Sequence, residues 1–379
     1  LVDEGVATKE DTDRGAKIGL RWAMGPFEIM NRVGIERTYA VVEDIAARYP
    51  DFRIPDILVR QKSLGKPFTF RFVDLNVKNG VATITINRPE AMNALNEAVV
   101  EQLEAQFDRA ETDPEVKAIV FQGAGKAFVA GADIRYFVDK IRTDRIEDIV
   151  AFTRRGHQLL LRIENTPKLT VALLDGLSLG GGSELALACQ AIVATPAGSL
   201  GFPETAIGIY PGLGGMLRLA RHVGPELAKY YVFTGTPISA ADAQALGIVR
   251  KLVSPNEVSD AVAALIETGK PDKYAPRTLP DKFKPLALTG SRENVDRLLA
   301  GRPPEGVESG LAEKTAKIVG YKAPLALKAA DEIIDLQTGV PIPEAVEIEL
   351  SRLQEIFASA DALEGLTAMG RRRPEYQGR

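Results

Sequence analysis

The feature that most constrains the fold is a change in the spacing of apolar residues at Phe72. After this point two strand-like runs, 75–77 and 81–86, flank the dipeptide Asn79-Gly80. Asn-Gly between such runs is the strongest short signal for a β-hairpin, because both residues tolerate a positive φ. The sequence therefore predicts that a hairpin opens a second domain near residue 71.

Helical and strand-like segments alternate after this hairpin. Asn96 fits the N-cap of a helix whose apolar residues Val99, Leu103 and Phe107 recur every four positions. Further strand-like runs, with helical stretches between them, occupy residues 118–121, 171–174 and 191–194. Alternation of this kind predicts an α/β architecture.

Residues 1–70 have a different pattern, which predicts a small all-α segment. Thr8 with Asp11 fits a helix-start signal, and Gly25-Pro26 punctuates a second apolar run. An all-α piece of this size with few large apolar residues is a poor independent domain, so we expect it to dock on another one.

The second domain divides into three parts. Residues 71–257 carry the strand–helix alternation and form its expected core. Residues 258–309 lose periodicity and contain several proline breaks, which predicts an insertion rather than a core element. Residues 310–379 form an expected C-terminal helical region, with helices over 324–335 and 343–357.

Composition excludes several classes of protein. With 47 Lys and Arg against 51 Asp and Glu, the net charge of −4 is too near neutral for a nucleic-acid binder. The single cysteine, Cys189, cannot form an intrachain disulfide, and with only two histidines the chain lacks the usual zinc ligands. We therefore expect a cytoplasmic protein that uses no metal.

The ends and the apolar stretches of the chain carry two further expectations. The longest charge-free apolar stretch, 185–203, is broken by prolines and glycines in its second half, which predicts that no segment spans a membrane. Residue 1 is Leu, so we expect either a processed protein or part of a longer one.

Three consecutive glycines mark the first candidate site. No Rossmann fingerprint, P-loop or nucleophile elbow is present. Gly180, Gly181 and Gly182 instead lie between a strand-like run and a helical one that begins near Glu184. Exposed N–H groups at a helix start can hold an oxyanion. A plain tight turn, with Glu184 favoured by the helix dipole, is the alternative.

A second turn of small residues supplies another candidate donor. Ala130, Gly131 and Ala132 follow a strand-like run, and Asp133 fits the N-cap of the next helix. Two such turns at the ends of neighbouring strands would bring two N–H groups toward one carbonyl oxygen.

Glu204 is the second candidate acid. It follows Pro203 and precedes the glycine-rich stretch PGLGG at 211–215. A glutamate in a loop is most often solvated. One helix and one strand separate it from Glu184, however, so both carboxylates could face one cavity and divide acid and base roles.

These blocks, in this order, resemble the crotonase (enoyl-CoA hydratase/isomerase) family. The resemblance is carried by NRPEAMNALN (87–96), AFVAGADI (127–134), LGGGSE (179–184), GFPE (201–204) and PGLGG (211–215), and it closes with DALEG (361–365) and Arg373-Pro374. It implies a crotonase-like spiral of ββα units with C-terminal helices, assembled as trimers or hexamers.

The resemblance also implies roles for particular residues. Ala132 and Gly181 would donate the oxyanion-hole N–H groups, and Glu184 and Glu204 would act as base and acid. The acyl-CoA site would be bounded by Arg88, Ala91, Met92, Ala94, Leu95, Ala130, Asp133, Ile134, Leu179, Gly180, Pro203 and Gly212. The chain departs from the family at Met369 and Gly370, where an aromatic residue and a lysine often occur, and in its longer segment 258–309.

The first seventy residues resemble a different family. The motifs EGVA (4–7), EDTD (10–13) and MGPFE (24–28) are similar to the C-terminal domain of 3-hydroxyacyl-CoA dehydrogenases. The chain thus resembles the C-terminal part of a fused dehydrogenase–hydratase whose dinucleotide-binding domain is missing.

The implied reaction is reversible hydration of a trans-2-enoyl-CoA to a 3-hydroxyacyl-CoA, with coenzyme A as part of the substrate and no separate cofactor. Two alternatives stay open. One is isomerisation of a 3-enoyl-CoA, which needs a base but no bound water. The other is a non-catalytic scaffold of a multienzyme complex.

Overall fold

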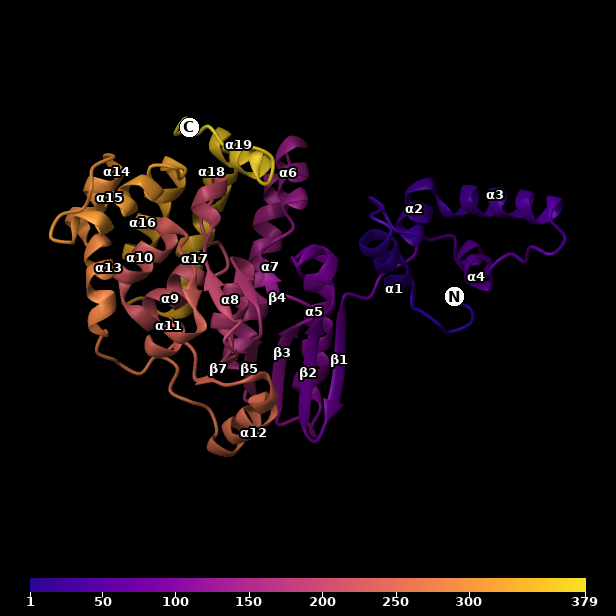
Figure 1. Cartoon of the computed structure of the whole chain (residues 1–379), viewed down its shortest axis with the longest axis horizontal. Helices are drawn as coiled ribbons and strands as arrows, with labels where there is room; N and C mark the ends of the chain where they lie inside the picture. The colour runs from indigo at the N-terminus through magenta and orange to yellow at the C-terminus, as the bar shows by residue number, and fades with distance from the viewer. The chain divides into compact units, whose positions relative to one another are not determined.

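A computed structural model describes all 379 residues, which divide into two compact units, Leu1–Phe72 and Val73–Arg379 (Figure 1). The first unit is helical, as predicted. It contains α1 (Lys9–Arg14), a π-helical turn (Gly15–Gly19), α2 (Pro26–Val33), α3 (Ile35–Arg48) and α4 (Asp56–Leu64).

The first unit has the predicted helix cap and a small apolar core. The Thr8 side chain caps α1 by accepting a hydrogen bond from the Asp11 N–H at 3.0 Å. Its small core contains Phe27, Ile35, Leu58 and Phe68, and the two Phe rings meet edge to face. This unit therefore holds one apolar cluster of its own.

The second unit contains two sheets. The larger runs, in spatial order, through β1 (Val73–Lys78), β2 (Val81–Ile86), β3 (Ala118–Gly123), β5 (Leu169–Leu174), β7 (Ala191–Ala194) and β10 (Lys251–Leu252). The smaller runs through β4 (Ala127–Ala130), β6 (Leu177–Leu179), β8 (Ser199–Gly201) and β9 (Ile238–Ser239). The predicted hairpin is β1–β2, with Asn79 and Gly80 at φ of 52° and 75°.

The chain alternates between the sheets. β3, β5 and β7 pair in parallel in the larger sheet, and β4, β6 and β8, which directly follow them, pair in parallel in the smaller one. This succession of two strands and a helix confirms the predicted spiral of ββα units. Parallel strands bring their carboxyl ends to one edge, which is where such folds place their ligands.

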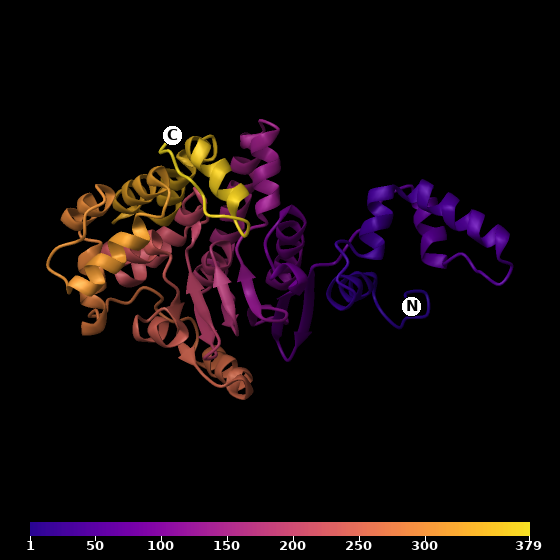
Figure 2. The same ribbon diagram turned by 45° about the horizontal axis from the view of Figure 1, so that its top comes forward.

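Helices surround the sheets (Figure 2). They are α5 (Glu97–Thr112), α6 (Ile134–Arg142), α7 (Ile146–Asn165), α8 (Gly181–Ala188), α9 (Gly215–Val223), α10 (Pro225–Thr234), α11 (Ala240–Ala245), α12 (Val258–Thr268), α13 (Lys284–Thr289), α14 (Arg292–Leu299), α15 (Ser309–Val319), α16 (Pro324–Gln337), α17 (Ile342–Ser351), α18 (Leu353–Phe357) and α19 (Ala360–Ala368). Short 3-10 turns occupy Pro89–Ala91, Glu204–Ile207, Pro255–Glu257 and Asp281–Phe283. No helix combines the length and apolar character needed to cross a membrane.

Two expectations about the C-terminal half need correction. Residues 258–309 are not wholly an appendage, because Ala261, Val262 and Leu265 of α12 pack in the core cluster with strands β3, β5 and β7. Their spacing gives α12 an apolar stripe that covers the sheet. The helix expected over 343–357 is interrupted at Arg352, which separates α17 from α18.

Candidate active site

One cavity opens where β4 and β6 end. It holds about 950 Å³ of empty space including its open mouth. Ala132, Gly181, Glu184 and Glu204, the four residues implied to take part in the reaction, all line it. Figure 1 shows α19 beside α6 near the carboxyl ends of the strands, and residues of both helices or their edges complete the wall.

The N–H groups of Ala132 and Gly181 lie in neighbouring turns, and neither is hydrogen-bonded within the protein. β4 and β6 pair in parallel with Ala130 opposite Leu179, so Ala132 and Gly181 each lie two residues beyond a paired position. The Ala132 N–H makes no hydrogen bond within the protein. Gly181 is the first residue of α8, a position whose N–H has no helical acceptor.

Each donor follows a glycine with positive φ. Gly131 has a φ of 82° and Gly180 a φ of 47°, conformations that residues with a Cβ adopt only under strain. The glycines therefore turn the chain sharply at the end of each strand and allow close approach to the backbone.

Both carboxylates lie close to the Gly180–Gly181 peptide. A Cβ on Gly180 would be 2.2 Å from Glu204 Oε1 and 3.8 Å from the Gly131 Cα. A Cβ on Gly181 would be 3.9 Å from Glu184 Oε2. Both acids thus approach the peptide that carries one of the two N–H donors.

Glu184 is buried and firmly held. Its Oε1 accepts hydrogen bonds from the N–H groups of Leu213, at 2.7 Å, and Gly215, at 3.0 Å. Burial raises the pKa of Glu184 well above its usual range, and the charges of Glu204 and Glu349 add to the effect. The two amide hydrogen bonds oppose it, because they favour the ionised form.

Glu204 is held differently. It begins a 3-10 turn after β8, and its buried Oε2 has no hydrogen-bond partner in the protein. Burial raises the pKa of Glu204 to about 8, and the negative charge of Glu349 also raises it. A hydrogen bond from the backbone amide of Glu204 itself acts in the opposite direction and lowers the pKa. Because the two acids interact closely, they titrate as a pair.

The structure places the residues implied to bind acyl-CoA in two groups. Seven line the cavity: Leu95, Ala130, Ile134, Leu179, Gly180, Pro203 and Gly212. Five do not: Arg88, Ala91, Met92, Ala94 and Asp133. The second group lies alongside the cavity, because residues 92–95 hydrogen-bond to residues 130–133, as in the Leu95 N–H to Gly131 O bond at 2.9 Å.

Asp133 caps the N-terminus of α6, as the sequence predicts. Its side chain accepts from the Arg135 N–H at the start of α6 and pairs with Arg88 at 3.0 Å. Burial opposes the effect, but hydrogen bonds and charges from Arg135 and Arg88 lower the pKa of Asp133 to about 2. The pair connects the segment after β2 to the turn that carries Ala132.

Sequence reasoning missed most of the apolar wall. The missed residues lie on or next to α5, α6, α7, α18 and α19, and in the segment between β8 and α9: Val100, Phe137, Phe152, Thr153, Gly156, Ile207, Ile209, Tyr210, Leu213, Leu353, Phe357, Leu366 and Met369. Helical apolar stripes look the same whether they face a core or a cavity, so the sequence held no separate signal for them.

Both units of the chain match known protein families. A family model described as enoyl-CoA hydratase/isomerase matches residues 81–377, and one for the C-terminal domain of 3-hydroxyacyl-CoA dehydrogenase matches residues 1–71. A probable enoyl-CoA hydratase of Bacillus subtilis (strain 168) is 33% identical over 81% of this chain and 98% of that protein. A short-chain-enoyl-CoA hydratase of Clostridium acetobutylicum is 38% identical over 49% of this chain and 70% of its own length.

A solved structure shares the fold. The crystal structure of an enoyl-CoA hydratase from Rhodobacter sphaeroides 2.4.1 superposes with a TM-score of 0.70 at 29% identity, covering 81% of this chain and 93% of that one. Fold, ordered motifs and family model coincide over the second unit. The chain therefore belongs to the enoyl-CoA hydratase/isomerase family.

Proposed function

We propose that this chain hydrates trans-2-enoyl-CoA thioesters reversibly to 3-hydroxyacyl-CoA. The observation that carries the proposal is the convergence of two buried acids and two unengaged N–H groups on one apolar cavity. Hydratases among its relatives support the reaction class. The match of residues 1–71 supports a role as the hydratase part of a bifunctional 3-hydroxyacyl-CoA dehydrogenase/enoyl-CoA hydratase.

The N–H groups of Ala132 and Gly181 would bind the thioester oxygen and stabilise the negative charge that develops on it. Fixed donors of this kind each contribute on the order of 10²–10³ in rate. A water held between the carboxylates adds its oxygen to C3 and gives its proton to one acid, while the other acid gives its proton to C2. A proton then passes back between the acids, so the enzyme is restored.

The hydrogen bonds of the two glutamates suggest which one acts as base and which as acid. Two N–H groups stabilise the carboxylate form of Glu184, which suits it to accept the proton from water. Glu204 Oε2 has no such donor, and this difference in hydrogen bonding favours Glu204 as the acid that supplies the proton to C2, although burial raises the pKa of both acids. We therefore propose Glu184 as base and Glu204 as acid.

The residues around the cavity would also divide the acyl-CoA substrate between them. Arg88, Ala91, Met92, Ala94 and Asp133 would flank the coenzyme A portion, and the other residues of the implied site would contact the acyl thioester. Coenzyme A is part of the substrate, and the proposed hydration uses no metal ion or separate cofactor. Trimers or hexamers in the cytoplasm complete the proposal by family resemblance alone.

Product analysis tests this function against the alternatives. The purified chain is incubated with enoyl-CoA thioesters of increasing length, beginning with crotonyl-CoA, and with a 3-enoyl-CoA. Hydration predicts 3-hydroxyacyl-CoA from the 2-enoyl substrates. A 2-enoyl-CoA formed from the 3-enoyl substrate, without hydration, would show an isomerase, and absence of thioester binding would show a scaffold.

The pH dependence follows from the pKa of Glu204. The reaction needs Glu204 protonated, and its pKa is about 8. We expect kcat/KM to fall roughly tenfold per pH unit above this pH, as the acid loses its proton. Steady-state kinetics with crotonyl-CoA across the pH range measures this limb.

A control variant tests whether the loss of any buried acid shifts this alkaline limb. Asp331→Asn changes another buried acid, whose partner Lys229 keeps its pair with Asp335. Its alkaline limb should coincide with that of the wild type. An alkaline limb governed by an ordinary carboxyl pKa, near 4.5, would contradict the role of Glu204.

A further inference from the structure

Three consecutive peptide groups in the loop before α9 are held at both ends by buried side chains. On the N–H side, Leu213 and Gly215 donate to Glu184 Oε1, as described above. The N–H between them, on Gly214, donates to Glu349 Oε1 at 2.7 Å. Two glutamates from different helices, α8 and α17, therefore share the donors of one short loop.

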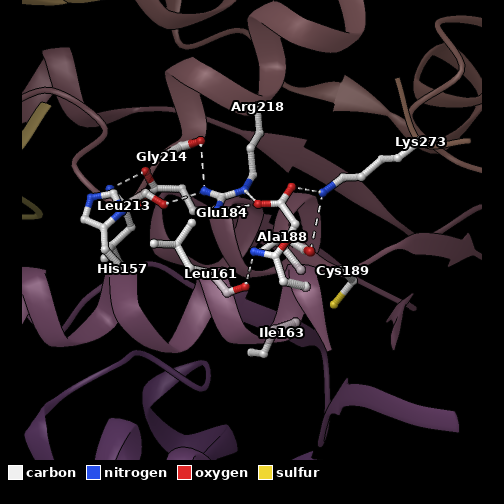
Figure 3. Close-up of polar contacts among 12 residues, drawn as sticks. His157, Leu161, Ile163, Glu184, Ala188, Cys189, Leu213, Gly214, Arg218 and Lys273 are labelled. Atoms are coloured by element: carbon white, nitrogen blue, oxygen red, sulfur yellow. Dashed lines mark hydrogen bonds and ion pairs between the residues drawn. The ribbon is translucent and has the colours of Figure 1, made fainter. Parts of the chain in front are cut away.

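The carbonyl oxygens of these peptide groups are held by one arginine and one histidine. His157 Nε2 lies 2.9 Å from the Gly212 oxygen, and because a carbonyl only accepts, this nitrogen is assigned the proton. Arg218 Nη1 donates to the oxygens of Leu213, at 3.3 Å, and Gly214, at 3.4 Å. Figure 3 shows His157 and Arg218 approaching the loop from opposite sides.

The holding groups are buried and connected. Arg218 and Glu349 are completely buried, and His157 lies 3.2 Å from Glu349 Oε1. Arg218 pairs with Glu164 at 2.8 Å, and Glu164 in turn pairs with Lys273 at 2.7 Å. Burying several charges is costly unless each is paired, so the loop is fixed by groups whose own positions are fixed.

We propose that Glu349, His157 and Arg218 are positioning residues that hold the loop 211–215 so that its N–H groups aim at Glu184. The inference rests on the proposed hydration. None of the three lines the cavity, whereas Gly212, Leu213 and Glu184 do. They therefore act on the reaction through the loop and not through contact with substrate.

Glu349 has an electrostatic effect besides its hydrogen bond. Burial is the largest cause of the raised pKa of Glu204, and the negative charge of Glu349 adds to it. The titratable or charged groups around Glu349 come from several elements: His157 of α7, Glu184 of α8, Glu204, Tyr210, whose hydroxyl bonds to the Glu349 carbonyl, and Arg218 of α9. Removing only the charge of Glu349 should lower the pKa of Glu204.

Two substitutions of Glu349 separate its roles. Glu349→Leu removes the acceptor of the Gly214 N–H, and Glu349→Gln keeps an oxygen for it but removes the charge. We expect Glu349→Leu to lower kcat for crotonyl-CoA hydration by about 10- to 100-fold, because small misplacements of a catalytic group have effects of this size. The Kd for butyryl-CoA, a saturated thioester, should change by less than about threefold, since Glu349 lies outside the cavity.

Glu349→Gln should recover most of kcat at its own pH optimum, with the alkaline limb moved to lower pH. Asp331→Asn, which changes a buried acid that does not line the cavity, should leave both kcat and the alkaline limb unchanged. If Glu349→Leu keeps kcat within about threefold, the positioning role is wrong, and if the alkaline limb of Glu349→Gln does not move, the electrostatic effect of Glu349 on Glu204 is wrong. Should Glu349→Leu fail to fold, the Glu349→Gln limb decides.

A spectroscopic titration keeps this inference separate from the proposed function. Failure of the wild type to hydrate any enoyl-CoA would refute the function. The infrared carbonyl band of protonated Glu204, identified by its loss in Glu204→Gln, still reports the pKa in that case. A lower titration midpoint in Glu349→Gln supports the effect of Glu349, and an unchanged midpoint overturns it.

Discussion

Glu184→Gln is expected to lower kcat for crotonyl-CoA hydration by about 10²–10⁴, the usual contribution of a positioned acid–base group. The amide side chain fits the same space and its oxygen still accepts from the Leu213 and Gly215 N–H groups. It cannot take the proton of the attacking water. The loss should therefore fall on kcat, with butyryl-CoA affinity and thermal stability little changed.

Glu204→Gln should show a loss of similar size for the complementary reason, since an amide does not supply a proton to C2. Glu101→Gln, an exposed substitution on α5, serves as the control and should leave kcat unchanged. Near wild-type turnover by either buried variant would refute its catalytic role.

Gly180→Ala is expected to abolish most activity through geometry alone. The new methyl would lie 2.2 Å from Glu204 Oε1, far inside van der Waals contact, so the carboxylate must move away from the Gly181 N–H. We expect kcat to fall by about 10²-fold, the size seen when a reacting group is misplaced by roughly 1 Å. Stability should also fall by about 1–3 kcal/mol, because alanine is strained at a φ of 47° with a ψ of −120°.

Gly269→Ala is the matched control for backbone strain. Gly269 also has positive φ, 75°, but a Cβ there meets nothing within 4 Å. Gly269→Ala should lose about the same 1–3 kcal/mol of stability in urea unfolding while keeping kcat. Equal losses of kcat in the two variants would show that strain, and not displacement of Glu204, explains the effect.

Local signals in the sequence predicted much of the fold. The Asn79-Gly80 hairpin and the Asn96 and Asp133 caps all depend on neighbouring residues, and the structure confirms each. The crotonase spiral came from the resemblance, and alternation alone gave only the α/β class. Gly180, Gly181 and Glu184 were found because glycines and an acid at a helix start are informative together.

Groups that act across long sequence distances were not predictable. Glu349 accepts a hydrogen bond from the Gly214 N–H, although the two residues are 135 positions apart in the sequence. In the sequence, Glu349 cannot be distinguished from the other glutamates of an amphipathic helix. His157 likewise looked like an isolated histidine, although its Nε2 is 2.9 Å from the oxygen of Gly212. The role of α12 in the core was missed because prolines downstream dominated the pattern of residues 258–309.

A double-mutant cycle of Glu184→Gln and Glu204→Gln tests most directly whether the two acids handle one water molecule. Rates of crotonyl-CoA hydration are measured for the wild type, both single variants and the double variant. Residues that act as one unit give strongly non-additive losses. We predict that the double variant is no more than about tenfold slower than the worse single one; losses that multiply in full would contradict a shared water.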